Sequence, residues 1–90
     1  MTYEEFKNKI RFMKNNAADL DYDINVNSFY FYFDYGTVYF IGKNKDINIG
    51  TYSEVNDETF TKIPKHQMPL YVDTEEQIEY LYHLCIMEGL

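Results

Sequence analysis

An acidic repeat near residue 20 is the part of this sequence that comes closest to a known chemical site. Asp19, Asp21 and Asp23 alternate with other residues, and a D-x-D-x-D run is how an EF-hand calcium loop begins. That loop also needs a glycine at its sixth position and a bidentate glutamate at its twelfth. The chain has Ile24 and Tyr30 at those positions. The sequence therefore predicts a solvated acidic connection between a helix and a sheet instead of a calcium site.

Other metal and catalytic chemistry lacks its usual residue pattern. His83 and Cys85 lie two residues apart, which on a helix separates their directions by about 200°. His66 stands between two prolines, and it would serve an enzyme only in a deep cleft that also holds a carboxylate. The sequence has no zinc spacing, nucleophile elbow or phosphate loop. We therefore expect no cofactor, no metal and no enzymatic activity, with Cys85 packing as a small hydrophobic residue.

A second group of acids lies near the C-terminus. Glu75, Glu76 and Glu79 fall where a helix is predicted, and Glu75 and Glu79 are one turn apart, with Cβ atoms about 6 Å from each other. This distance is comparable with the spacing of phosphates along one nucleic-acid strand. A row of such carboxylates could occupy a nucleic-acid groove on another protein. Solubility is the alternative explanation for the same residues.

Tyrosines form the third group of candidate residues. The chain has 10 of them, and Tyr30, Tyr32 and Tyr39 are predicted to share the exposed face of a sheet. Tyrosine is enriched at protein–protein interfaces, where it contributes contact area at low entropic cost. RNA stacking is the other use of sheet aromatics, but it needs neighbouring lysines or arginines. An equally good explanation is that these tyrosines only cover a half-exposed sheet face and have no partner.

The charge balance narrows the kind of partner. The 90 residues contain 8 Lys and Arg against 15 Asp and Glu, a net charge of −7. Residues 1–16 carry a local charge of about +2 and the remaining residues about −9, by the same formal count. Such a chain repels phosphates, so we expect no direct nucleic-acid contact. A protein with a basic surface is the favoured partner, because long-range attraction speeds encounter.

Two amphipathic helices are predicted to flank a sheet. Residues 1–16 read as a helix that begins with capping-box spacing at Thr2 and Glu5. A second helix begins with the same spacing at Thr74 and Gln77 and ends near Gly89. Its apolar residues exceed what one sheet face requires. We therefore expect that this helix is either wedged between the sheet and the first helix or partly reserved for another chain.

Between the helices, period-two alternation predicts strands over residues 24–33, 37–41 and 47–52. Short turns would join them into an antiparallel meander, and residues 59–63 read as a short fourth strand at most. Phenylalanines should face the core and the tyrosines solvent. The predicted fold is α+β, a two-layer sandwich in a single domain of residues 1–90. A single cysteine, no apolar run long enough for a membrane span and no signal-peptide layout favour a cytoplasmic protein without a membrane partner.

The organisation of the chain resembles that of the small acidic proteins that phages and mobile elements encode against bacterial defence. These include anti-CRISPR proteins with an α-β-β-β-α order. The resemblance lies in the opening M-T-Y-E-E-F helix, the F-Y-F-Y-F-D-Y-G-T-V-Y-F-I hairpin, the I-N-I-G-T-Y strand and the closing E-E-Q-I-E-Y-L-Y helix. It concerns organisation alone, so it assigns no functional residue.

Together these observations predict a non-enzymatic acidic protein that inhibits a host or defence protein by covering a basic, nucleic-acid-binding surface. The carboxylates of both acidic groups would pair with lysine or arginine, and the sheet tyrosines would exclude water. The alternative is a scaffolding protein that self-associates through its C-terminal helix, as a homodimer.

Overall fold

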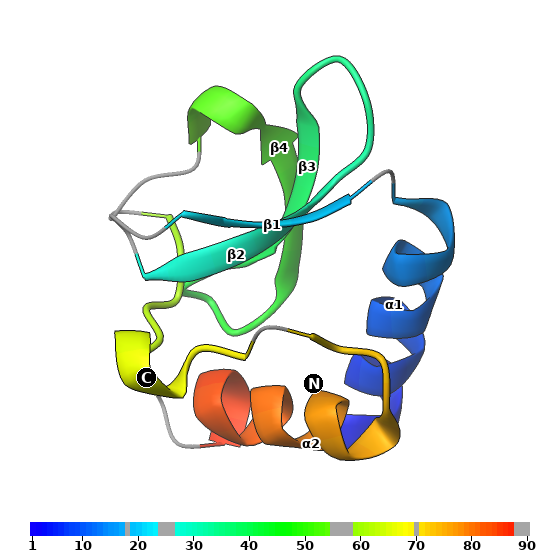
Figure 1. The fold of residues 1–90 in the computed structure, drawn as a ribbon, viewed down its shortest axis with the longest axis vertical. Coiled ribbons are helices and arrows are strands. Elements are labelled where there is room, and N and C mark those ends of the chain that lie inside the picture. Colours follow the sequence, from blue (N-terminus) through cyan, green and yellow to red (C-terminus); the bar gives the residue numbers. More distant parts are fainter. Residues whose placement is uncertain (18, 24–26, 55–58, 70, 88–90) are drawn as a thin grey trace.

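The computed structural model describes residues 1–17, 19–23, 27–54, 59–69 and 71–87. Helix α1 (Tyr3–Asn16) leads into a four-stranded antiparallel sheet, and helix α2 (Glu75–Tyr82) closes the chain (Figure 1). The strands are β1 (Asp19–Asp23), β2 (Ser28–Tyr32), β3 (Thr37–Ile41) and β4 (Ile47–Thr51), in the spatial order β1-β2-β3-β4. In Figure 1, α1 runs down the right of the sheet and α2 runs across below it, and both helices contribute to the larger core. The predicted α+β fold is confirmed.

Helix α1 forms as its sequence predicts. Thr2 has extended backbone angles, and its hydroxyl accepts a hydrogen bond from the Glu5 N–H at 3.2 Å. This bond satisfies one of the N–H groups that the first turn of a helix leaves without a partner. Phe6, Ile10 and Met13 recur at steps of three and four, and all three are buried. The apolar stripe of α1 therefore faces the core.

The hairpin between β2 and β3 closes with a two-residue turn. Tyr35 and Gly36 both have positive φ, at 45° and 83°, and the Thr37 N–H donates to the Asp34 carbonyl at 2.7 Å. Two consecutive positive φ angles are typical of a type I′ turn, whose twist matches that of the flanking strands. The predicted turn and the predicted strand over residues 37–41 are confirmed.

The fourth strand is not where the sequence predicted it. Residues 19–23, read as a solvated connection, form β1 and pair with β2 along their whole length. Residues 59–63 contribute only a single bridge, between Phe60 and Gly42. The physical reason is that Leu20 lies opposite Phe31 and packs against the core that the helices cover. This partly buried leucine anchors an edge strand that is rich in aspartate, because alternate residues of a strand point to opposite faces.

Helix α2 begins with the predicted capping box. The Thr74 hydroxyl accepts from the Gln77 N–H, while the Gln77 side chain accepts from the Thr74 N–H at 3.0 Å. Ile78, Leu81 and Cys85 are buried. A π-helical turn, η3 (His83–Met87), follows directly, and Gly89, the predicted end, lies outside the described residues. No helix in the described ranges has the length and apolarity needed to cross a membrane.

The sheet carries a core on each of its two faces. The larger core joins α1 and α2 to one face and includes Phe31 and Ile41. A smaller one on the other face consists of Tyr30, Val38, Phe40 and Phe60. Two short 3-10 helices, η1 (Tyr52–Glu54) and η2 (Lys65–Gln67), lie in the long segment between β4 and α2. This segment therefore covers a face that the sequence analysis left exposed.

Candidate partner-binding surface

The three sheet tyrosines do not form one exposed platform. Tyr30 is only 4% exposed, and its ring meets that of Tyr52 edge-on, with centroids 5.5 Å apart. Tyr39 lies opposite Phe31 in the register, so it points to the face of the sheet opposite Tyr30. The centroid of its ring lies 4.6 Å from that of Phe33. The expectation of a shared exposed face is wrong for these residues. It failed because the segment after β4 covers the Tyr30 face.

Tyr32 also contributes to the fold. It is half-buried against the smaller core, and its hydroxyl accepts a hydrogen bond from the Gly36 N–H at 3.3 Å. This bond ties the ring to the β2–β3 turn. Tyr32 therefore has little ring surface to offer a partner.

The acidic repeat of β1 is only partly described. Asp21 is exposed and lies directly opposite Tyr30 in the register. The side chains of Asp19 and Asp23 lie outside the described residues. Among the described residues, no group of three His, Cys, Asp or Glu side chains is placed to hold a metal ion.

Two carboxylates at the start of α2 are engaged by lysines of α1. Glu75 lies 3.2 Å from the Lys7 ammonium group, which also pairs with Glu4 at 3.1 Å. Lys14 forms an ion pair with Asp73. The Lys7 side chain is only 13% exposed, and its hydrogen bonds to Glu4 and then to Glu75 raise its pKa. These contacts hold the two helices together, so Glu75 is a structural carboxylate.

Glu76 and Glu79 are the α2 carboxylates that lie away from these lysines. Each helical residue is rotated about 100° from the last, which places both on the arc opposite the buried Ile78 and Leu81. Both are exposed. Glu79 lies 3.8 Å from the His83 imidazole. Within the described part of the chain, no lysine or arginine forms an ion pair with either carboxylate.

A groove runs beside Glu76, between α2 and the segment that precedes it. Its volume is about 600 Å³, and we call it the α2 groove. Among the described residues, those that line it are Pro69, Tyr71, Thr74, Glu76, Gln77 and Tyr80. Tyr71 is 62% exposed and Tyr80 45% exposed. The groove therefore combines two accessible aromatic rings with a carboxylate.

One hydrogen bond fixes the wall of the α2 groove. The Tyr80 hydroxyl donates to the carbonyl of Gln67 at 3.1 Å, which ties η2 and the following Pro69 to the helix. The sequence analysis named Glu76 but neither Tyr71 nor Tyr80 as a candidate, so it missed this site. The available signal was that Glu76 and Tyr80 are four residues apart and so share one helix face.

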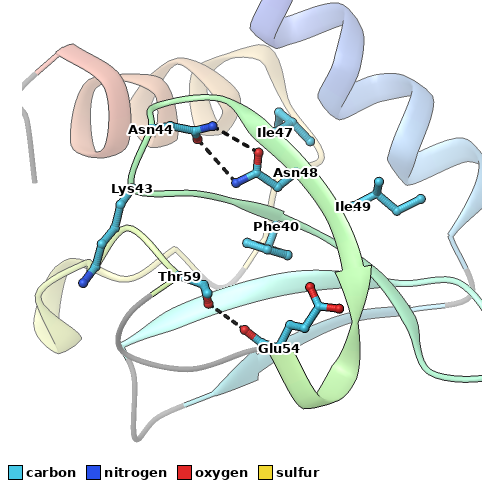
Figure 2. A pocket seen from close by; sticks show the side chains of 8 residues that line it. All are labelled: Phe40, Lys43, Asn44, Ile47, Asn48, Ile49, Glu54 and Thr59. Carbon is cyan, nitrogen blue, oxygen red and sulfur yellow. Dashed lines mark hydrogen bonds between the residues drawn. The ribbon is translucent and has the colours of Figure 1, made fainter.

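A second hollow, of about 590 Å³, lies over β3 and β4. Figure 2 shows Asn44 and Asn48 at one end, Glu54 at the other and Phe40 between them. The two amides bond each other reciprocally at 3.3 Å, and Asn48 occupies the space where a side chain on Gly42 would stand. Each amide is the hydrogen-bond partner of the other, so these residues stabilise the turn between β3 and β4 and are not available to a ligand.

Two carboxylates cap backbone N–H groups of β4. An Asp46 oxygen accepts from the Ile47 N–H at 2.7 Å, and a Glu54 oxygen accepts from the Thr51 N–H at 3.3 Å. The first bond, together with the Lys9 ammonium group at 3.2 Å, lowers the pKa of Asp46. Both acids therefore stabilise the sheet edge.

Cys85 is buried in the larger core. Burial raises the pKa of its thiol to about 12, so the reactive thiolate is strongly disfavoured. The prediction that this residue packs as a small hydrophobic side chain is confirmed.

No known protein family, curated protein or solved structure matches this chain.

Proposed function

We propose that this protein is a non-enzymatic binding protein that covers a basic surface on a partner protein, with the α2 groove and its flanking carboxylates as the contact surface. The class of partner is a nucleic-acid-binding host or defence protein, such as a CRISPR effector, whose function would be inhibited. One observation carries the proposal. Glu76 lines the groove together with the exposed rings of Tyr71 and Tyr80, Glu79 is exposed one helical turn further along α2, and no described lysine or arginine pairs with either carboxylate.

The distribution of charge supports this surface over the others. Lysines of α1 engage Asp73 and Glu75, so the carboxylates of α2 that remain for a partner are those of Glu76 and Glu79. Unpaired surface charges of one sign steer an oppositely charged protein toward the surface that bears them. Exposed tyrosines next to them can then exclude water at close contact. The combination suits recognition of a cationic protein surface.

The test is affinity capture from a nuclease-treated bacterial lysate with three forms of the purified chain. The first is the natural sequence, and the second is Glu76→Lys/Glu79→Lys. The third is Glu5→Lys/Asp34→Lys, a control with the same change in net charge at two exposed residues outside the groove. We expect basic nucleic-acid-binding proteins on the natural chain, a several-fold loss with the α2 variant and retention with the control.

Two further measurements make the test decisive. Capture should weaken steeply as salt is raised, because exposed charges are screened beyond about 8–10 Å. Added DNA should release the captured proteins, because it would compete for the same basic surface. Equal capture by the α2 variant and the natural chain, or capture that salt does not affect, would contradict the proposal.

One observation favours the alternative of self-association. Met87, in η3, is 61% exposed, and an exposed apolar residue at the end of a helix can contact a second copy. Sedimentation at micromolar concentration separates the two ideas. A dimer that Met87→Ser dissociates favours a scaffold, whereas a strict monomer leaves the binding protein as the better explanation.

A further inference from the structure

We infer that the α2 groove binds an arginine side chain of the partner protein. The inference rests on the proposed function and names the chemistry of the contact. The groove presents the rings of Tyr71 and Tyr80 and the carboxylate of Glu76 along one hollow of about 600 Å³. Pro69 contributes a further apolar surface to the same hollow.

An arginine side chain matches each of these features. Its guanidinium group is planar, stacks on aromatic faces and donates two parallel hydrogen bonds to a carboxylate. Its aliphatic stem can lie along apolar surface while the charged end stays hydrated. A lysine ammonium is more strongly hydrated and forms no planar stack, so it would gain less from two tyrosine rings.

The negative charge of the groove disfavours an anion, a second copy of the chain or a neutral apolar segment as its ligand. A phosphate or another anion would approach Glu76 with the same sign of charge, in a chain whose net charge is −7. A second copy of the chain could present the basic side chains of α1, but its net charge of −7 opposes its approach to an acidic surface. A neutral apolar segment would leave the exposed Glu76 carboxylate beside it without a cation. Complementarity therefore selects a cationic side chain.

The Tyr80 side chain and the start of α2 are held in place before any partner arrives. The hydrogen bond from the Tyr80 hydroxyl to the Gln67 carbonyl holds one wall. The Thr74–Gln77 capping box holds the helix start that carries Glu76. Side chains that are already fixed lose less entropy on binding. This rigidity favours a specific contact over a diffuse attraction between charged surfaces.

The experiment is an NMR titration of the full chain with a short capped oligo-arginine peptide, repeated with oligo-lysine of equal length. We expect saturable shifts of the Tyr71 and Tyr80 ring signals and of the Glu76 signals. We also expect tighter binding of the arginine peptide. Glu76→Gln and Tyr71→Leu should each raise the Kd of the arginine peptide about two- to fivefold, as for loss of one exposed cation–π or ion-pair contact.

Glu5→Gln is the matched control, because it removes one exposed negative charge on α1, outside the groove. It should leave the Kd almost unchanged. The inference is overturned if Glu5→Gln and Glu76→Gln weaken binding equally. It is also overturned if shifts spread over all acidic residues or if oligo-lysine binds as tightly as oligo-arginine.

The NMR titration and the lysate experiment test the arginine site and the proposed function separately. If the lysate experiment succeeds and the tyrosine rings do not respond to oligo-arginine, the arginine site is wrong and the basic partner stands. If oligo-arginine binds in the groove and no basic protein is captured, the arginine site stands and the proposed function is wrong.

Discussion

The Lys7 ammonium group lies 3.2 Å from the Glu75 carboxylate, and these two residues join the first helix of the chain to the last. A carboxylate engaged in this way is part of the fold. The same helix carries Glu76, for which the described residues offer no lysine partner. Neighbouring glutamates on α2 therefore have different surroundings, and each can be tested separately.

The Lys7–Glu75 contact should contribute to stability. In a double-mutant cycle with Lys7→Met and Glu75→Gln, we expect a small favourable coupling energy, because the Glu75 carboxylate is largely exposed. Urea unfolding measures it. Glu76→Gln is the control and should change the free energy of unfolding by less than about 0.5 kcal/mol. A coupling energy near zero would show that the pair does not hold the helices together.

Tyr30 should behave as a core residue. Tyr30→Ala removes a side chain that is 4% exposed, and we expect it to lower the free energy of unfolding by about 3 kcal/mol. Tyr71→Ala, at a residue that is 62% exposed, should cost less than about 1 kcal/mol. Thermal and urea unfolding of both variants test the difference. Equal costs would contradict the assignment of Tyr30 to the smaller core.

The β2–β3 turn offers a stabilising substitution. Tyr35 is 99% exposed and has φ of 45°, a conformation that asparagine adopts more readily than tyrosine. We expect Tyr35→Asn to stabilise the protein by about 0.5–1 kcal/mol. Gly36→Ala should cost about 1 kcal/mol. Its added Cβ would meet no atom within 4 Å, so that cost isolates the effect of the positive φ. A destabilising Tyr35→Asn would refute this interpretation of the turn.

Asp46 should make stability depend on acid pH. The Ile47 N–H and then Lys9 lower its pKa, so its contribution is present above the unfolded value of about 3.9 and is lost as pH falls through the folded value. We expect the natural chain to lose more stability than Asp46→Asn between about pH 5 and pH 3, by less than about 1 kcal/mol because the side chain is half exposed. Urea unfolding across that range, with Asp34→Asn as a matched control, measures the effect. Parallel curves for Asp46→Asn and the natural chain would contradict it.

The sequence predicted the parts of the fold that depend on nearby residues. The caps at Thr2 and Thr74 and the turn at Gly36 are set by contacts within a few positions, so spacing alone indicated them. Strand β1 was missed because three aspartates outweighed the single Leu20 that anchors it. The burial of Tyr30 depends on Phe60, 30 residues later, and no local pattern reports such a contact.

The sequence analysis named some residues of the candidate surface but not the place where they meet. The charge balance and tyrosine content indicated a surface for a cationic protein, and Glu76 and Glu79 were among the candidates. Tyr71, Tyr80 and Pro69, which also line the groove, were not among the candidates. Tyr71 and Pro69 reach α2 only through the path of the chain after η2. The hydrogen bond from Tyr80 to Gln67 spans 13 residues and has no signature in sequence spacing.

The capping of β4 by Asp46 and Glu54 has a consequence for the behaviour of the protein at high concentration. A strand at the border of an open sheet is a template on which other copies can add strands and grow into fibrils. Strand β4 has no charged residue of its own, and its Ile49 is 61% exposed. The two carboxylates occupy N–H groups that an incoming strand would otherwise use. Asp46 and Glu54 therefore oppose the addition of strands from other copies. The net charge of the chain overstates the number of carboxylates that remain for recognition of a partner.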